Sequence, residues 1–117
     1  MKPRVVWAMV GVAALTFFVT GASKLLALPP SPENFQRWGF SMNFMRLIGA
    51  VEVLGAIALA WPRTSFLAAA LLIADMLGAL RTGVVYREAL HIVVPLLLLI
   101  LLGAIAWARR ATVRSPR

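Results

Sequence analysis

Four ionisable side chains interrupt the hydrophobic segments of this sequence, one in each segment: Lys24, Glu52, Asp75 and His91. Such groups are costly inside a bilayer, and those found there usually bind ligands or ions or move protons. Two carboxyl groups, an ammonium group and an imidazole can together hold a polar headgroup by hydrogen bonds or exchange protons with it. We therefore predict one shared, ligand-binding polar site, with Arg46 at its rim.

The composition places these residues in a membrane protein. Hydrophobic residues make up 62% of the chain and the mean hydropathy is +0.88, more than the polar exterior of a soluble domain allows. The net charge is +8, but the basic residues lie at the ends of hydrophobic segments and form no stripe with aromatic residues. We therefore expect no nucleic-acid partner. Because the chain has no cysteine, it forms no disulfide and no thiolate metal site.

Four hydrophobic segments are long enough to cross a bilayer as helices. The first two end before Pro29 and Pro62, because proline donates no backbone hydrogen bond and restricts the residue before it. The sequence therefore predicts an all-α fold, an integral membrane, antiparallel four-helix bundle that forms one transmembrane domain over residues 1–117. The expected spans are residues 5–28, 42–61, 65–82 and 89–108, followed by a basic, disordered tail at residues 109–117.

The connections between these spans carry less information. The longest, residues 33–41, contains Phe35, Trp38 and Phe40, and we expect it to lie on the membrane surface as a short amphipathic segment. The turn at residues 81–88 is interpreted as solvated. The N-terminal segment also resembles a cleavable signal peptide, but its apolar stretch is longer than a typical signal core, and cleavage would remove a helix from the bundle.

The distribution of basic residues predicts the orientation of the bundle. Four spans place both termini and the 62–64 turn on one side with seven Lys and Arg residues, and leave five on the other. We therefore expect both termini in the cytoplasm. At 1.5 Å per residue, Lys24, Asp75 and Glu52 then lie about 6, 8 and 12 Å inside the outward ends of their helices, and His91 lies near the end of its own. All four belong to the outward half of the bundle.

The face of the second span that carries Glu52 is rich in small residues. Helical spacing aligns Glu52 with Met45, Gly49, Ala56 and Ala60. Small residues let helices approach closely, so this face is expected to turn inward. Glu52 is then predicted to point into the bundle, where Lys24 is the nearest candidate for an ion-pair partner.

A structural role is the alternative for each of these residues. Lys24 alone is typical of a membrane anchor whose ammonium group reaches the headgroups. A pair of Lys24 and Glu52 can serve only to fix helix packing. Asp75 can cap a neighbouring helix or pair with Arg46 or Arg81, and a histidine at the start of a helix is often simply solvated.

Short motifs along most of the chain carry a family resemblance. They are Thr20-Gly21-Ala22-Ser23-Lys24-Leu25, Phe35-Gln36-Arg37-Trp38-Gly39-Phe40, Ile48-Gly49-Ala50-Val51-Glu52-Val53-Leu54-Gly55-Ala56 and Asp75-Met76-Leu77-Gly78-Ala79. Together they resemble the DoxX-like family of small four-helix membrane proteins, although Ser41 stands where that pattern has proline. The resemblance implies a bacterial inner-membrane protein of the group named for the membrane subunit of a thiosulfate to quinone oxidoreductase. By position, Lys24 and Glu52 match the intramembrane charged pair of that family.

Three functions remain open for this sequence. The first is an accessory subunit of a membrane redox complex, in which the polar site binds a quinone or a lipid headgroup. Without cysteine or a pair of histidines, such a subunit relies on another carrier for its electrons. The second is a structural or assembly protein in which the pair of Lys24 and Glu52 only fixes the helices. The third is a small-molecule transporter, but Lys24 is a poor binder of cations.

The expected cofactors and partners follow from the first of these functions. We expect an accessory protein more than an enzyme by itself, with no catalytic residue, no metal and no covalently bound cofactor, and with a quinone or a lipid as reversible ligand. The expected partners are the lipid bilayer and a protein of the redox complex. Small-residue faces are compatible with a homodimer and equally with packing inside one chain.

Overall fold

The computed structural model describes residues 2–114, with side chains described as far as Arg110. Over this range the chain forms α1 (Pro3–Leu25), α2 (Ser31–Arg37), α3 (Met42–Leu59), α4 (Pro62–Val85) and α5 (Leu90–Arg114). All of these helices except the short α2 are long and apolar enough to cross a membrane. The predicted all-α membrane bundle is therefore confirmed.

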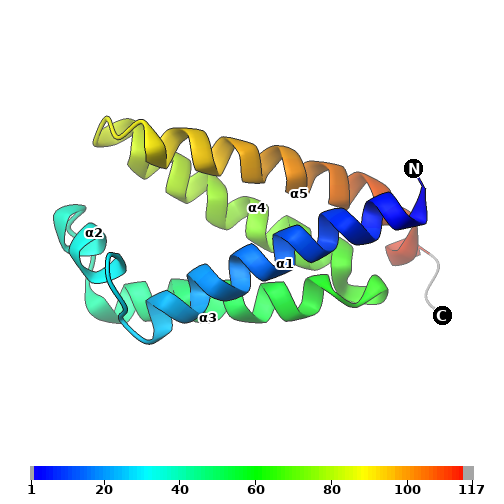
Figure 1. Ribbon diagram of the computed structural model, residues 1–117, viewed down its shortest axis with the longest axis horizontal. Helices are drawn as coiled ribbons and strands as arrows, with labels where there is room; N and C mark the ends of the chain where they lie inside the picture. The colour runs from blue at the N-terminus through cyan, green and yellow to red at the C-terminus, as the bar shows by residue number, and fades with distance from the viewer. Residues whose placement is uncertain (1, 115–117) are drawn as a thin grey trace.

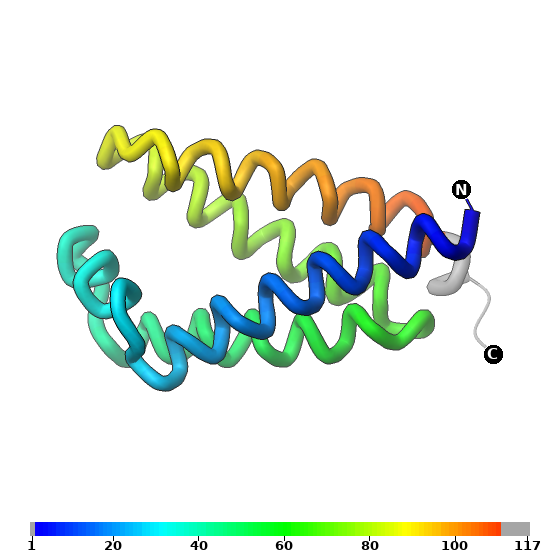
Figure 2. Tube along the Cα trace, viewed as in Figure 1, coloured from blue at the N-terminus to red at the C-terminus, as the bar shows by residue number. Residues whose placement is uncertain are grey.

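The four long helices pack side by side, α1 on α3, α3 on α4, α4 on α5 and α5 on α1. Both ends of the chain and the α3–α4 connection lie at one end of the bundle, here called the termini end (Figure 1). The short helix α2 and the α4–α5 turn lie at the opposite end, here called the α2 end. Packing is most extensive within the α1–α3 and α4–α5 pairs, and Figure 2 shows these two pairs diverging toward the α2 end.

Buried apolar side chains fill the half of the bundle nearer the termini end. The core draws mainly on the earlier parts of α1 and α4 and the later parts of α3 and α5, which meet there because successive spans alternate in direction. Its large, fully buried members are Val10, Phe17, Leu59, Leu72, Leu102 and Ile105. This close-packed half holds the helices together and leaves the other half free to carry polar groups.

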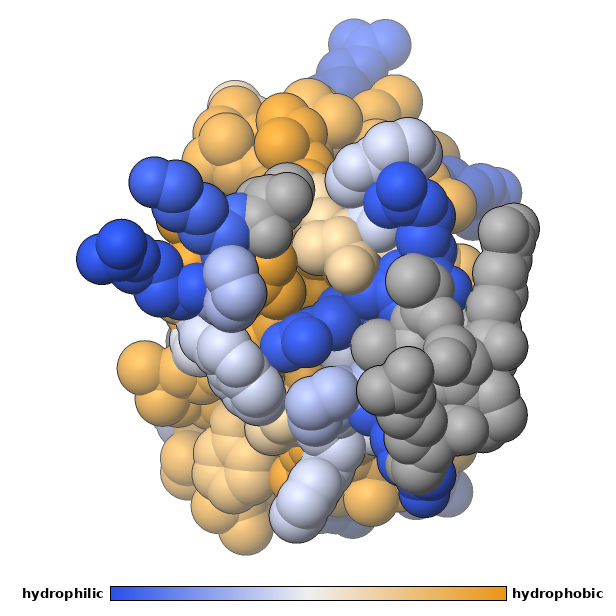
Figure 3. All heavy atoms as spheres, turned by 90° about the vertical axis from the view of Figure 1, so that its right-hand side faces the viewer, coloured by the Kyte–Doolittle hydropathy of each residue, from blue (hydrophilic) through white to orange (hydrophobic). Residues whose placement is uncertain are grey.

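The surface at the termini end is basic. Figure 3 looks onto this end and shows strongly hydrophilic residues gathered beside apolar surface. No acidic residue occurs at sequence positions 1–32 or 89–117. The basic residues near this end with described side chains are Lys2, Arg4, Arg63, Arg109 and Arg110.

Several predicted helix boundaries are wrong by two or three residues, among them the end of the third span, which is Val85 and not residue 82. The first span ends at Leu25 and not at residue 28, because Ala27 adopts a left-handed conformation with φ of 53° that a helix cannot include. The third span begins at Pro62 and not at residue 65. Proline is readily accommodated in the first turn of a helix, where its missing N–H would have no partner in any case.

The prediction of a disordered tail from residue 109 is also wrong over the described range, because α5 continues to Arg114. Arginine and alanine favour helices, and the next helix breaker is Pro116. The guanidinium group of Arg109 also lies over the ring of Trp7, with the carbon 4.8 Å from the ring centroid, which ties the end of α5 to α1. Residues 115–117 of that prediction lie outside the described residues.

Helix α2 lies across the α2 end of the bundle within the connection predicted to be amphipathic (Figure 1). Its Phe35 is buried, with ring centroids 5.8 Å from Phe40 and 6.5 Å from Phe44. Gly39, with φ of 81°, provides the left-handed turn that leads from this helix to α3. At the start of α3, the side chain of Ser41 accepts a hydrogen bond from the backbone N–H of Phe44 and caps the helix.

Candidate functional site

A cavity of about 410 Å³ occupies the half of the bundle nearer the α2 end. All five helices contribute to its wall, which is mainly apolar and aromatic. Apolar and aromatic lining residues include Phe17, Phe35, Trp38, Phe40, Ile48, Met76, Val94, Pro95 and Leu98. Leu90 and Val94 line the cavity while 68% and 43% exposed, so the cavity is not sealed along α5.

Lys24 and Glu52 form an ion pair on the wall of this cavity. The Nζ atom of Lys24 lies 2.8 Å from Oε1 of Glu52, and the hydroxyl group of Thr20 donates to the same oxygen at 3.1 Å. The side chain of Glu52 is only 2% exposed and that of Lys24 17%. A buried carboxylate is tolerated where opposite charge and hydrogen-bond donors surround it. Helix α1 supplies both to Glu52, the positive charge from Lys24 and a further donor from Thr20.

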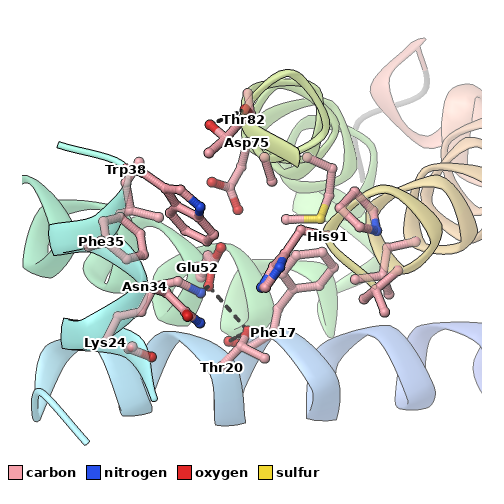
Figure 4. A pocket seen from close by; sticks show the side chains of 18 of the residues that line it. Phe17, Thr20, Lys24, Asn34, Phe35, Trp38, Glu52, Asp75, Thr82 and His91 are labelled. Atoms are coloured by element: carbon pink, nitrogen blue, oxygen red, sulfur yellow. Dashed lines mark hydrogen bonds and ion pairs between the residues drawn. The ribbon is translucent and has the colours of Figure 1, made fainter. Parts of the chain in front are cut away.

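Asp75 comes from α4 and faces the pair formed by Lys24 and Glu52. In Figure 4 its carboxyl group points toward Glu52 from the opposite side of the cavity, and it interacts with Glu52 through a side-chain hydrogen bond and electrostatically with both Glu52 and Lys24. Its Oδ2 atom is buried and accepts no hydrogen bond from any described residue. Two carboxyl groups and one ammonium group thus face one another across this part of the cavity.

Glu88, on the turn between α4 and α5, connects the end of α2 with the start of α5 at the α2 end of the bundle. Its two carboxylate oxygens accept hydrogen bonds from Arg37 at 2.8 and 3.0 Å, and Oε2 also accepts one from the indole N–H of Trp38 at 3.0 Å. The Nδ1 atom of His91 lies 2.9 Å from Oε1. The turn is exposed, as expected, but Glu88 is more than a solvated residue of it, because this carboxylate holds α2 and the start of α5 together.

The electrostatics at Glu88 follow from these contacts. The hydrogen bonds from Arg37 and then from Trp38 stabilise the carboxylate and lower the pKa of Glu88 from its usual 4.5 to about 2. The hydrogen bond to Glu88 likewise raises the pKa of Arg37. Both groups therefore stay charged throughout the physiological pH range.

A second contact fixes the end of α2 over the cavity. The hydroxyl group of Tyr86 donates to the backbone carbonyl of Trp38 at 2.9 Å. The Trp38 ring meets the His91 ring edge to face, with centroids 5.0 Å apart and an interplanar angle of 83°. Side chains of the α4–α5 turn and of α5 therefore hold Trp38 by its indole N–H, its carbonyl and its ring, and Trp38 lines the cavity that they enclose.

The structure brings together four of the five residues predicted for the site. Lys24, Glu52, Asp75 and His91 all line the cavity. Arg46 does not line it and is exposed, so its placement at the rim was wrong. At about 100° per residue, the six positions between Arg46 and Glu52 turn their side chains roughly 120° apart around α3.

The sequence-based prediction missed Asn34, Trp38, Thr82 and Glu88. Asn34 and Thr82 line the cavity, and the hydroxyl group of Thr82 donates to the carbonyl of Gly78 at 3.0 Å. Glu88 precedes His91 by three positions, a spacing that brings side chains together at the start of a helix and that could have indicated the contact. Among the described residues, no three His, Cys, Asp or Glu side chains are grouped so that they could hold a metal ion.

Comparison with known proteins places the chain in a family. No curated protein and no solved structure matches the chain. The family model described as the DoxX-like family matches residues 8–105, from α1 well into α5, and so includes every helix that contributes to the cavity. Because this match covers most of the chain, the protein is a multi-pass membrane protein that belongs to the DoxX-like family.

Proposed function

We propose that this protein binds an amphiphilic molecule of the quinone or lipid-headgroup class in its cavity, as an accessory subunit of a membrane redox complex. The observation that carries the proposal is a cavity with apolar and aromatic walls that has Lys24, Glu52, Asp75 and His91 on its lining. Its volume falls within the range of about 300–1,000 Å³ that is common for small-molecule sites.

The chemistry of the wall favours a ligand with a polar head and an apolar body. The ammonium group of Lys24 has donors beyond the one directed at Glu52, and aromatic rings such as Phe35 and Trp38 offer faces for a planar headgroup. Because the cavity is unsealed along α5, whose outer surface is apolar, a hydrocarbon chain can extend from it toward lipid.

An accessory role agrees with the residues that the chain offers for redox chemistry. It contains no cysteine and one histidine, and so lacks the thiolates of an iron–sulfur site and a histidine pair for haem. A bound quinone or a partner protein would therefore carry the electrons.

Native mass spectrometry of the protein purified in mild detergent tests this proposal. We expect wild type to retain a quinone or lipid, and Glu52→Gln to lose it, because the substitution removes the charge that orients Lys24. Arg46→Gln is the matched control, since Arg46 lies on the same helix outside the cavity, and it should retain the ligand. A wild-type protein that carries no such molecule, even after incubation with decylbenzoquinone, would count against the proposal.

We further propose that both termini lie in the cytoplasm of a bacterial inner membrane. Basic residues collect at the termini end, and all four acidic residues lie at sequence positions 33–88. Basic residues are retained on the cytoplasmic side of membrane proteins. A reporter fused after Arg117 should be active only as a cytoplasmic reporter, and activity as a periplasmic reporter would reverse the orientation.

A structural role of the ion pair is the second candidate function. It is favoured by the position of Lys24 and Glu52 directly beside the closest approach of α1 and α3, where a buried pair can fix helix register. If the pair serves only packing, the double variant Lys24→Leu, Glu52→Leu should keep the cellular phenotype of wild type as well as its stability. Under ligand binding, the double variant folds but loses the retained molecule.

A further inference from the structure

We infer that the ligand of this cavity carries hydroxyl groups, as a hydroquinone-type amphiphile does, and that Asp75 and His91 accept hydrogen bonds from them. The inference rests on the proposed function, since it names the form of the molecule that the same cavity selects. A quinone and its hydroquinone differ in hydrogen bonding, because the quinone oxygens only accept hydrogen bonds whereas the hydroquinone oxygens also donate them.

The polar wall of the cavity has a surplus of acceptors. Glu52 already accepts from Lys24 and Thr20, whereas the Oδ2 atom of Asp75 is buried without a donor among the described residues. A buried carboxyl oxygen without a partner is unfavourable, and a hydroxyl group of a ligand beside Asp75 would remove that cost.

Most donors that line the cavity are already used within the protein. The indole N–H of Trp38 is directed at Glu88, and the hydroxyl group of Thr82 at the carbonyl of Gly78. A quinone would find the remaining hydrogens of Lys24, the hydroxyl group of Ser31 and the amide of Asn34 as donors, but it would leave the Oδ2 atom of Asp75 unsatisfied. The hydroxylated form satisfies Asp75 and can still accept from Lys24 through the same oxygens.

His91, from α5, adds a second acceptor to the lining of the cavity. Its Nδ1 atom lies 2.9 Å from the carboxylate of Glu88, which orients the Nδ1–H of a neutral ring toward that carboxylate. In this tautomer Nε2 is an acceptor. The edge-to-face contact with Trp38 further fixes the ring, which points into the cavity in Figure 4. Asp75 from α4 and His91 from α5 thus present acceptors to one ligand.

Two pairs of probes test this inference in lipid nanodiscs. The first pair, decylhydroquinone and decylbenzoquinone, differs in oxidation state. The second pair is 4-decylphenol, which carries a hydroxyl group, and 4-decylanisole, in which that hydroxyl group is methylated. Redox chemistry does not interconvert the members of the second pair. We expect wild type to bind the hydroxylated member of each pair about tenfold more tightly, measured by titration with native mass spectrometry. Equal affinity within both pairs, or a preference for decylbenzoquinone, would overturn the inference while leaving the proposed function intact. Failure of all four probes to bind would overturn both.

Asp75→Asn tests whether Asp75 accepts a hydrogen bond from the hydroxyl group of the ligand, because the amide keeps the shape of the side chain and adds a donor. We expect this variant to lose most of the tenfold preference for decylhydroquinone, and to bind decylbenzoquinone no more weakly than wild type does. His91→Gln should reduce the same preference independently, which keeps the inference testable if Asp75→Asn fails to fold. Arg46→Gln serves as the control outside the cavity and should keep the wild-type preference. An unchanged preference in both cavity variants would overturn the assignment of the acceptors.

Discussion

Gly21 of α1 and Gly49 of α3 meet backbone to backbone, so that a Cβ atom on either glycine would lie 2.7 Å from the carbonyl oxygen of the other. Lys24 and Glu52 each follow one of these glycines by three positions, which is close to one helical turn. The missing Cβ atoms therefore allow the approach of α1 and α3 that brings the ammonium group and the carboxylate into contact.

We expect Gly21→Ala and Gly49→Ala to destabilise the protein. Each new methyl group would meet backbone atoms that cannot turn away, and overpacking of this kind typically costs about 1–3 kcal/mol. Thermal unfolding in detergent, followed by circular dichroism, measures the loss. The control is Gly11→Ala on the same helix, where an added Cβ meets no atom within 4 Å. If Gly11→Ala lowered the melting temperature as much as Gly21→Ala does, the close crossing would not be the cause.

The buried ion pair leads to an asymmetric stability prediction. Lys24→Leu alone leaves the carboxylate of Glu52 buried without its ammonium partner, although it still accepts from the hydroxyl group of Thr20. Loss of one partner of a buried pair costs about 3–5 kcal/mol. Replacing both Lys24 and Glu52 by leucine removes both charges and should recover most of that loss. Denaturant unfolding of the two single variants and the double variant measures the coupling. Additive losses in the double variant would show that the two side chains act independently.

The turn between α4 and α5 depends on Gly83. A Cβ atom at this position would collide with the backbone carbonyl of His91 and lie 3.1 Å from the backbone nitrogen of Ile92. We expect Gly83→Ala to push the start of α5 away from α4, at a cost of about 1–3 kcal/mol. Gly78→Ala, on the same helix with no atom within 4 Å of the new Cβ, should change the melting temperature little. Equal effects of the two substitutions would contradict this account.

The polar cluster could be predicted from the sequence because each of its members is costly in an apolar segment. Counting residues along the spans placed Lys24, Glu52, Asp75 and His91 at similar depths, and in the structure all four line the same cavity. Depth does not determine the direction of a side chain around its helix. Arg46 therefore had a suitable depth but the wrong face, and the small-residue face of α3 was the better guide.

The contacts around Glu88 could not be predicted in the same way. Arg37 lies 51 positions before Glu88 in the chain, and no helical or strand periodicity relates residues so far apart. Their contact depends on how α2 folds back over the bundle, which local pattern does not specify.

The helical extension of α5 beyond residue 108 could not be predicted either, because basic residues at the end of an apolar segment are typical of a span that stops there.

The low pKa of Glu88 predicts how Trp38, which lines the cavity and donates a hydrogen bond to Glu88, responds to acid. Because the folded protein lowers this pKa from 4.5 to about 2, the carboxylate stabilises the fold fully above about pH 4.5, and that stabilisation is lost as the pH falls toward 2. Protonation would weaken the hydrogen bonds from Arg37 and Trp38, and the indole ring should then become more exposed. We therefore expect the fluorescence of Trp38 to shift to the red as the pH falls from about 4.5 toward 2.

A protein in which Trp7, Trp61 and Trp107 are replaced by phenylalanine isolates the emission of Trp38. In this background, Glu88→Gln removes the charged acceptor and should give red-shifted emission already at pH 7, with little further change on acidification. Glu33→Gln is the control, because Glu33 is an exposed acid on the same short helix as Arg37, whereas the indole N–H of Trp38 is directed at Glu88. Its acid response should match that of the parent. An acid-induced red shift that persisted at full amplitude in Glu88→Gln would assign the transition to a group other than Glu88.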